Sequence, residues 1–409
     1  MDLIEFRSEL LHVGMSLPFT VRDDAGRILL AKGQKIESSV QLTGIQNRRK
    51  IFVEIEKTDA GVRAMMSGIS ELSRADAPIK DFAKFLNVRQ AAKVVHKEEG
   101  SLSQRWGDLE SKLGGLLASA QTVDDFQGKV YTLDHSIVRL LGQDASGSQF
   151  LLFNRAVTHF GGYSVLHSLL CAAVLNSLAE LFLLSDTERR SLVCAALTMN
   201  MAMTHLQDML ALQAHAPSPV QRSTIDAHPA QGCQMLAQCG VTDALWLSVV
   251  EQHHAALAGP EKIADWPLAQ RMTRMLQTVD RYTAAMSPRK SRAGRTARDS
   301  VRSVVLSAGD TKHDEVGTAL VGLLGLSPPG TYVMLANGET AVVVRRGLKP
   351  GGPWVASVLN RQGQPIAEPR LRDASKAEFL VQSTLTATSV KVNLNLDLML
   401  KLIPRQPFA

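Results

Sequence analysis

The sequence VLHSLLCAAVLNSLAELFLL, residues 165–184, is the most apolar stretch of the chain. It contains His167, Asn176 and Glu180, and polar groups of this kind are unfavourable in the hydrocarbon interior of a membrane. The stretch therefore predicts a buried helix in the core of a soluble protein rather than a membrane span. The rest of the helical pattern extends outward from it.

Apolar residues three and four positions apart recur on both sides of this stretch, which is the pattern of amphipathic helices. Ser185 and Glu188 have the spacing of a capping box, a signal for the start of a helix. We therefore expect residues 98–325 to form an all-α domain. Its long helices are predicted over residues 163–184, 186–203, 222–238, 242–256, 267–286 and 295–307.

Residues 1–57 have the composition of a small β-rich module. Two strand-like segments, 19–22 and 27–30, flank the sequence DDAG, whose aspartates and glycine suit a tight reversal of the chain. A further strand is predicted over residues 51–55. Residues 58–97, which mix charged and small apolar side chains, are expected to connect this module to the helical domain.

Residues 326–409 return to a strand pattern and are expected to form a C-terminal β-rich module. Strands are predicted over residues 332–336, 340–345 and 354–359. The pair Asn337-Gly338 separates the first two and is a strong signal for a hairpin with a type I′ turn. The sequence thus predicts a mainly α protein in which a central helical domain is flanked by two β-rich modules.

The composition bounds the class of protein. The chain has 409 residues, which is enough for two or three domains. Hydrophobic residues make up 45% and charged residues 21%, a globular balance that excludes wholesale disorder, a collagen-like repeat and a disulfide-stapled miniprotein. The net charge of +6 is too small over this length to predict nucleic-acid binding, but it is compatible with a small phosphate-bearing ligand.

The N-terminus and the cysteines predict a cytoplasmic protein. The opening sequence MDLIEFRSELL contains acidic residues and no basic segment followed by a long apolar run, so we expect no signal peptide. The cysteines have no CxxC spacing and are expected to be reduced, structural thiols. They are Cys171, Cys194, Cys233 and Cys239.

Histidines and one aspartate of the helical region form a possible set of metal ligands. They are His167, His228, the adjacent pair His253 and His254, and Asp280. A single histidine on an apolar helix face is usually only a packed core residue. Adjacent histidines cannot both face one side of a continuous helix, so a site that uses the pair requires an unwound turn. These side chains are expected either to hold one metal or to remain as packed polar residues.

Five segments of the helical region resemble the HD-GYP branch of the HD phosphohydrolase superfamily. They are YSVLH (163–167), HPAQG (228–232), VEQHH (250–254), VDRYTA (279–284) and SPRKSR (287–292). Members of this branch are helical domains whose metal centre hydrolyses the bacterial second messenger cyclic di-GMP. The resemblance implies an HD-type fold, with His167, His228, His253, His254 and Asp280 as metal ligands. It also implies that Arg289 and Arg292 contact the phosphates of a dinucleotide, for which guanidinium groups are well suited.

The chain departs from this pattern where catalysis depends on it. In the segment AALTMNMAM, Met199 and Asn200 occupy the positions of the histidine and aspartate that name the family, and Met203 replaces a lysine. The GYP loop after the histidine pair is replaced by AALAGP. A thioether and a neutral amide are poor ligands for hard cations and poor bridges between two of them. We therefore predict no catalytic residues and a degenerate member of the family, with at most one divalent transition metal (Fe, Mn or Zn). The set expected to hold it is His228, His253 and His254, and His167 with Asp280 is the remnant of the other half of the family's metal site.

The flanks extend the resemblance to most of the chain, since residues 13–33 and 328–339 are similar to modules that accompany HD-GYP domains in some bacterial proteins. The first hypothesis is a bacterial signalling protein that binds cyclic di-GMP or partner signalling proteins without turnover. An alternative is a metal-dependent phosphodiesterase with an altered, mononuclear site. A third is a structural adaptor whose β-rich modules are interaction surfaces. None of these involves nucleic acid or a membrane span.

Overall fold

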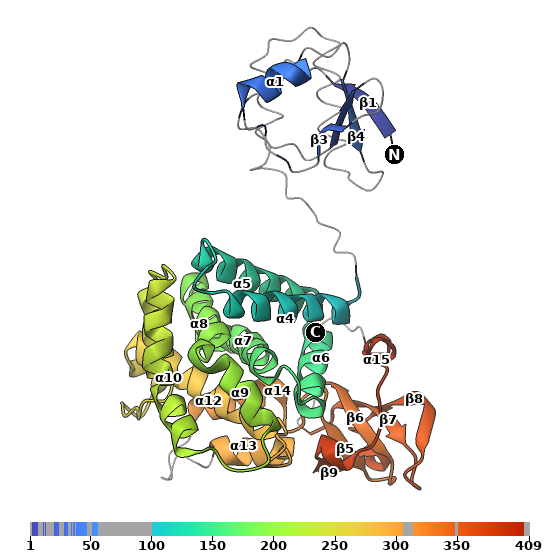
Figure 1. Cartoon of the computed structure of the whole chain (residues 1–409). Helices are drawn as coiled ribbons and strands as arrows, with labels where there is room; N and C mark the ends of the chain where they lie inside the picture. Colours follow the sequence, from blue (N-terminus) through green and yellow to red (C-terminus); the bar gives the residue numbers. More distant parts are fainter. Residues whose placement is uncertain are drawn as a thin grey trace. The chain divides into compact units, whose positions relative to one another are not determined.

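The computed structural model describes residues 100–305, 314–347 and 351–404, and parts of the N-terminal module between residues 2 and 55. The chain divides into two compact units, Met1–Glu98 and Glu99–Ala409 (Figure 1). It is mainly α, with a small antiparallel sheet near each end, as the sequence predicts. The expected connector over residues 58–97 lies outside the described residues.

The N-terminal unit is built on an antiparallel sheet with the strand order β1-β4-β2-β3. The two predicted strands pair antiparallel as β2 and β3, and the predicted later strand is β4. The reversal predicted at DDAG lies, beyond Asp23, outside the described residues. The helix α1 begins after Ser38, whose Oγ accepts a hydrogen bond from the amide of Gln41 at 3.2 Å. The elements are β1 (Asp2–Phe6), β2 (Thr20–Asp23), β3 (Ile28–Leu30), α1 (Ser39–Gln46) and β4 (Ile51–Ile55).

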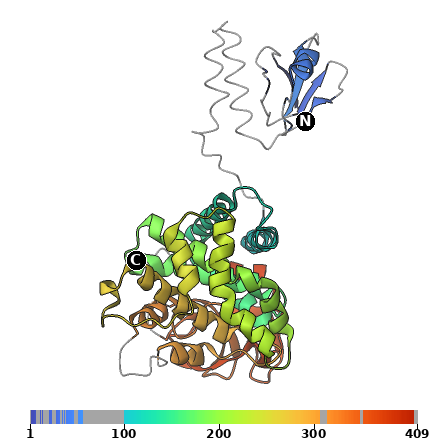
Figure 2. The same ribbon diagram turned by 60° about the vertical axis from the view of Figure 1, so that its left-hand side comes forward.

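The second unit begins with a helical domain, drawn in two orientations in Figures 1 and 2. Three of its helices start with complete capping boxes, at Ser101, Ser185 and Ser218, so the box predicted at Ser185 is confirmed. The helices are α4 (Leu102–Ala118), α5 (Phe126–Gln143), α6 (Ala145–Thr158), α7 (Tyr163–Leu181), α8 (Asp186–Thr198), α9 (Thr204–Leu212), α10 (Pro219–Gln238), α11 (Ala244–Gln252), α12 (Leu268–Met286), α13 (Ala297–Val305) and α14 (Glu315–Leu324).

The apolar helix α7 lies in the core of this domain and packs against α6, α8 and α12. By length and composition it is the one helix among the described residues that could cross a membrane, yet 72% of its most apolar window is buried inside the protein. Its neighbour α8 is anchored by Arg189, whose guanidinium donates to both carboxylate oxygens of Asp134 at 2.6 and 2.8 Å. The prediction of a buried core helix is confirmed.

The helix predicted over residues 186–203 is interrupted. Helix α8 ends at Thr198, the buried residues Met199 and Asn200 form a turn, and a short 3-10 helix follows over Met201–Met203. The turn lies against α10, where a Cβ atom added at Gly232 would meet the Met199 carbonyl oxygen at an ordinary contact distance of 3.7 Å. The continuous pattern of apolar residues explains why the sequence alone predicts one long helix.

The chain ends in a five-stranded antiparallel sheet with the order β8-β7-β6-β5-β9. It joins the helical domain where β6 packs on α6, and the Asn154 side chain donates to the carbonyl oxygen of Gly330 at 3.1 Å. The last described helix, α15, follows the sheet. The elements are β5 (Tyr332–Leu335), β6 (Thr340–Arg345), β7 (Trp354–Leu359), β8 (Pro365–Asp373), β9 (Val381–Leu385) and α15 (Leu396–Leu402).

The hairpin between β5 and β6 forms as predicted, but its turn type differs. A type I′ turn needs positive φ at both central residues. Here Gly338 has φ of 85° and Asn337 is not in that region. The amide of Gly338 donates to the carbonyl oxygen of Leu335 at 2.9 Å, which gives a longer loop that ends in a left-handed glycine. The prediction of a type I′ turn was therefore wrong.

Candidate metal centre

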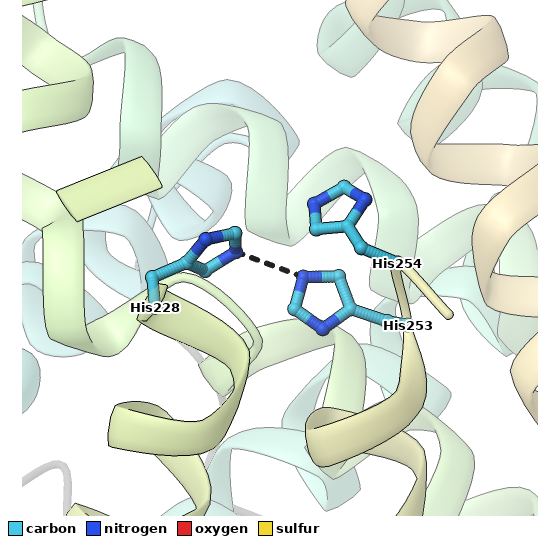
Figure 3. A group of neighbouring side chains, drawn as sticks. All are labelled: His228, His253 and His254. Carbon is cyan, nitrogen blue, oxygen red and sulfur yellow. Dashed lines mark hydrogen bonds between the residues drawn. The ribbon is translucent and has the colours of Figure 1, made fainter. Parts of the chain in front are cut away.

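Three histidines meet between α10 and α11 (Figure 3). His228 lies within α10, and His253 and His254 follow directly after α11, which ends at Gln252. One ring nitrogen from each residue lies within 4.8 Å of the others. Because the helix has ended, the adjacent histidines turn both rings toward His228, in agreement with the unwound turn that the sequence requires.

A proline determines how the His228 ring is held. Pro229 lies inside α10 and has no amide hydrogen, so the carbonyl of Ile225, four residues earlier, lacks its helical donor. The Nδ1 atom of His228 lies within hydrogen-bonding distance of this carbonyl oxygen. Since a carbonyl only accepts, Nδ1 carries the proton, and the Nε2 atom of the neutral ring is left with a lone pair.

His253 is held in the same way at the end of α11. Its Nδ1 atom lies 2.6 Å from the carbonyl oxygen of Val250, a group that the end of the helix leaves available. Nδ1 is again the donor, so Nε2 presents a lone pair. The two Nε2 atoms of His228 and His253 face one another at 3.0 Å (Figure 3). Two lone pairs at this distance repel each other unless a cation lies between them.

The lowered pKa values of both rings disfavour a proton as that cation near neutral pH. Burial, together with the neighbouring His254, lowers the pKa of His253 to about 4. Burial also lowers the pKa of His228 below its ordinary value. Both rings are therefore neutral at pH 7 and offer unprotonated Nε2 atoms, the form of imidazole that binds metals.

The geometry of the three histidines fits a single divalent transition metal. Metal–nitrogen distances of about 2.0–2.1 Å and tetrahedral angles place two ligand nitrogens about 3.4 Å apart, close to the 3.0 Å found between His228 and His253. The His254 ring lies 4.3 Å from the His253 ring and 5.1 Å from the His228 ring, centre to centre. His254 is exposed, so the site has an open side at which a water molecule or a ligand atom could bind.

The other two predicted ligands meet in a second cluster. His167 on α7 and Asp280 on α12 are joined by a bond of 2.7 Å between Nε2 and Oδ1. Although burial opposes ionisation of Asp280, this bond to His167 lowers the pKa of the carboxyl group to about 2. Burial also opposes protonation of His167, but Cys171, Tyr163 and Asp280 together raise its pKa well above the ordinary value. The two residues form a buried ion pair.

The two clusters are electrostatic neighbours. The charge of Asp280 acts on His228 and His253, where it favours the protonated rings, and the histidines in turn lower the pKa of Asp280. The structure thus brings all five predicted ligands into one region, divided into the three-histidine site (His228, His253 and His254) and the His167–Asp280 pair.

Cys171 is the site residue that the sequence reasoning missed. It was expected to be a structural thiol, but its sulfur lies 3.8 Å from Nε2 of His167 and 3.2 Å from Oγ1 of Thr283. Cys171 follows His167 by four residues on α7, a spacing that places both side chains on one helix face. That spacing was visible in the sequence and would have identified it.

The two arginines expected to contact a ligand have different surroundings. The guanidinium group of Arg289 lies over the Tyr163 ring and donates to its hydroxyl at 2.9 Å. Tyr163 in turn stacks on His167 with ring centres 5.5 Å apart. Arg292 instead donates to the Ala284 carbonyl oxygen at 2.8 Å, at the end of α12. Arg289 is thereby linked to the metal-ligand region, whereas Arg292 caps a helix.

The residues that the resemblance aligned with a histidine and an aspartate lie in the turn after α8. Met199 is fully buried, and Asn200 is 6% exposed. Met203 ends the 3-10 helix that follows. This turn therefore offers a thioether and a neutral amide, which hard metal ions favour less than imidazole and carboxylate.

No protein-family model matches the chain, and no curated protein matches it. Its structure is similar to that of Bd1817, an HDG"Y"P protein from Bdellovibrio bacteriovorus, with 12% sequence identity and a TM-score of 0.41. The match covers 79% of this chain and 99% of the Bdellovibrio chain.

Proposed function

We propose that this protein is a cytoplasmic bacterial signalling protein that holds one divalent transition metal at His228, His253 and His254 and uses the site to bind cyclic di-GMP without hydrolysing it. The observation that carries the proposal is the pair of Nε2 atoms 3.0 Å apart, each with its Nδ1 atom bonded to a backbone carbonyl. Backbone carbonyls that fix the tautomer of metal-binding histidines in this way are a common feature of metal sites.

The same site is unsuited to hydrolysis of a phosphodiester. Two-metal hydrolysis needs a carboxylate that bridges the cations and positions the attacking hydroxide. Asn200 offers only a neutral amide at the expected position, and Asp280 is engaged with His167. A metal held by three histidines would supply Lewis acidity and bind one phosphate oxygen, which suffices for recognition.

Arg289 is the group best placed to add affinity for a phosphate. Its partner is the Tyr163 hydroxyl, and among the described residues no carboxylate forms an ion pair with it. The guanidinium therefore has further N–H donors for phosphate oxygens. Arg292 donates to backbone carbonyls and is expected to contribute less.

Elemental analysis tests the metal. The purified protein, dialysed against excess Zn²⁺, Mn²⁺ or Fe²⁺ and then against metal-free buffer, should retain about one equivalent per chain. A His253→Ala variant should retain none, whereas His205→Ala, which removes an exposed histidine of α9, should behave as the native chain. A native protein that retains no metal, or a His253→Ala variant that retains as much as the native chain, would contradict the proposal.

Calorimetry and a turnover assay on the same preparation test the ligand. Cyclic di-GMP should bind the metal-loaded protein and be recovered intact. Arg289→Ala should weaken binding by about 10- to 100-fold, the worth of a charge-assisted hydrogen bond, and Arg298→Ala, on an exposed position of α13, should not. Metal-dependent release of linear product would favour the phosphodiesterase alternative, and absence of binding to any cyclic dinucleotide would favour the adaptor.

A further inference from the structure

The second cluster contains a thiol that the HD-type pattern does not predict. Cys171 and His167 lie one turn apart on the same face of α7, and Asp280 faces them from α12. One ligand atom from each, Sγ, Nε2 and a carboxylate oxygen, lies within 4.8 Å of the other two. Sulfur, nitrogen and oxygen donors therefore converge from two helices that pack directly against each other.

The distances are close to those of a tetrahedral metal site. Metal bonds of about 2.3 Å to sulfur and about 2.0–2.2 Å to nitrogen and oxygen place neighbouring ligand atoms about 3.3–3.7 Å apart. The Cys171 sulfur lies 3.8 Å from Nε2 of His167, and Oδ1 of Asp280 lies 2.7 Å from the same nitrogen. A rotation of the Asp280 carboxylate, whose side chain is 16% exposed, would open the remaining gap and admit the ion from solvent.

A hydroxyl supports the outer nitrogen of His167. Thr283 donates its only hydroxyl hydrogen to the carbonyl oxygen of Val279 at 2.9 Å, so its lone pairs are available to the Nδ1–H group of His167 at 3.4 Å. Metal-binding histidines commonly donate this second N–H group to a fixed acceptor. The Nε2 atom is therefore the one aimed at the cluster.

We propose that Cys171, His167 and Asp280 form a second metal site, separate from the three-histidine site and selective for a thiophilic ion such as Zn²⁺. A thiolate ligand favours zinc over magnesium and manganese, because soft sulfur binds borderline ions better than hard ones. Loading releases the thiol proton and the proton shared between His167 and Asp280. In the three-histidine site the Nδ1 atoms of His228 and His253 are bonded to carbonyl oxygens and their Nε2 atoms are free of protons, so this site should load first.

Cobalt substitution tests this site through a signal that does not depend on activity. The metal-free full-length protein is titrated with Co²⁺ under reducing conditions and followed by absorption. The first equivalent should give only the weak visible bands of cobalt bound to nitrogen ligands, and the second should add an intense thiolate-to-cobalt band in the near ultraviolet. Cys171→Ser should abolish the intense band and weaken the second binding step at least about tenfold.

Matched variants separate this site from its neighbour and from the other thiols. Cys233→Ser should keep the intense band, and His253→Ala should keep it while losing the first step, so failure of the three-histidine site is distinguishable from failure of this one. If Cys171→Ser does not fold, a variant that lacks Cys194, Cys233 and Cys239 tests the same point. Cys171 is then the sole thiol, so the intense band should remain. No intense band in that variant or in the native chain, or a band that persists in folded Cys171→Ser, would overturn the proposal.

Discussion

The three-histidine site and the His167–Asp280 pair are neighbours in one helical domain, but their polar atoms find hydrogen-bond partners in different ways. His167 and Asp280 satisfy each other directly across 2.7 Å. His228 and His253 are instead each satisfied on the outer nitrogen by a backbone carbonyl, and their inner nitrogens are left facing one another. We call the first cluster complete, because its polar groups satisfy each other, and the second incomplete, because its two Nε2 atoms face one another without a donor. Mutation and pH can measure this difference.

The largest effect is expected from breaking the complete cluster. Asp280→Ala leaves the buried His167 without its counter-ion, and removal of one partner of a buried ion pair typically costs about 3–5 kcal/mol. His253→Ala removes a lone-pair repulsion and should lower the unfolding free energy of the metal-free protein much less. Urea unfolding of both variants without metal gives the comparison, which fails if the two costs are equal.

Manganese should stabilise the protein through the three-histidine site only. At a free metal concentration 100 times the dissociation constant, binding adds about 2.7 kcal/mol to the unfolding free energy. Because manganese is unsuited to a thiolate site, Mn²⁺ reports on the histidines alone. The gain should vanish in His253→Ala and persist in His167→Ala, as measured by thermal unfolding with and without Mn²⁺; a gain that follows His167 instead would reverse the assignment.

The metal-free protein should lose stability as the pH falls below 6.5. The pKa of His253 is lowered from 6.5 to about 4 in the folded state, so the unfolded chain binds the proton more readily. Its contribution is fully present above pH 6.5 and declines by up to about 1.4 kcal/mol per pH unit between 6.5 and 4. His253→Ala should flatten this slope, and the control His205→Ala should retain it; unfolding curves at pH 7, 6 and 5 provide the measurement.

For the His167–Asp280 pair, the pH dependence of the unfolding free energy has the opposite sign over part of this range. Its histidine pKa is raised and its aspartate pKa is lowered. The contribution of His167 to the unfolding free energy is present below pH 6.5 and declines as the pH rises through its raised pKa. The contribution of Asp280 is present above pH 3.8 and declines as the pH falls toward 2. The pair therefore stabilises the fold most between these limits, so its variants should not remove the slope assigned to His253.

The smallest loss of unfolding free energy is expected from a change at Tyr163, which stacks on His167 beside the His167–Asp280 pair. Tyr163→Phe keeps the ring on His167 and removes only the hydroxyl that accepts from Arg289, so it should cost about 0.5–1.5 kcal/mol. Metal retention by the three-histidine site should not change. A large loss of metal in this variant would show that the two clusters are mechanically coupled.

The order of the histidines and Asp280 in the sequence pointed to five residues that the structure brings into one region. The adjacency of His253 and His254 required the end of a helix, which the structure shows at Gln252. The division into a three-histidine set and the His167–Asp280 pair followed from the resemblance, because sequence separation alone carries no distance.

The turn at Met199 and Asn200 was not foreseen for a physical reason. The apolar pattern continues across it, and the turn and the 3-10 helix after it lie against α10, a segment distant in the chain whose contacts the local pattern does not reveal. Cys171 was missed for a different reason: its apolar neighbours in the sequence are typical of a packed thiol, although its spacing from His167 places both side chains on one helix face. Predictions of local structure from capping residues, such as Ser185, depend on neighbours in sequence and were therefore confirmed.

Pro229 has a consequence for how quickly the protein could acquire an ion. Because the Ile225 carbonyl that it leaves available orients the His228 ring through the main chain, the orientation exists before any ion arrives and survives after it departs. Uptake would then require little reorganisation of the helix, and repeated loading and release could occur within an unchanged fold. Because Pro229 cannot donate a hydrogen bond, the His228 ring would have the same orientation in the protein without a metal ion as in the protein with one.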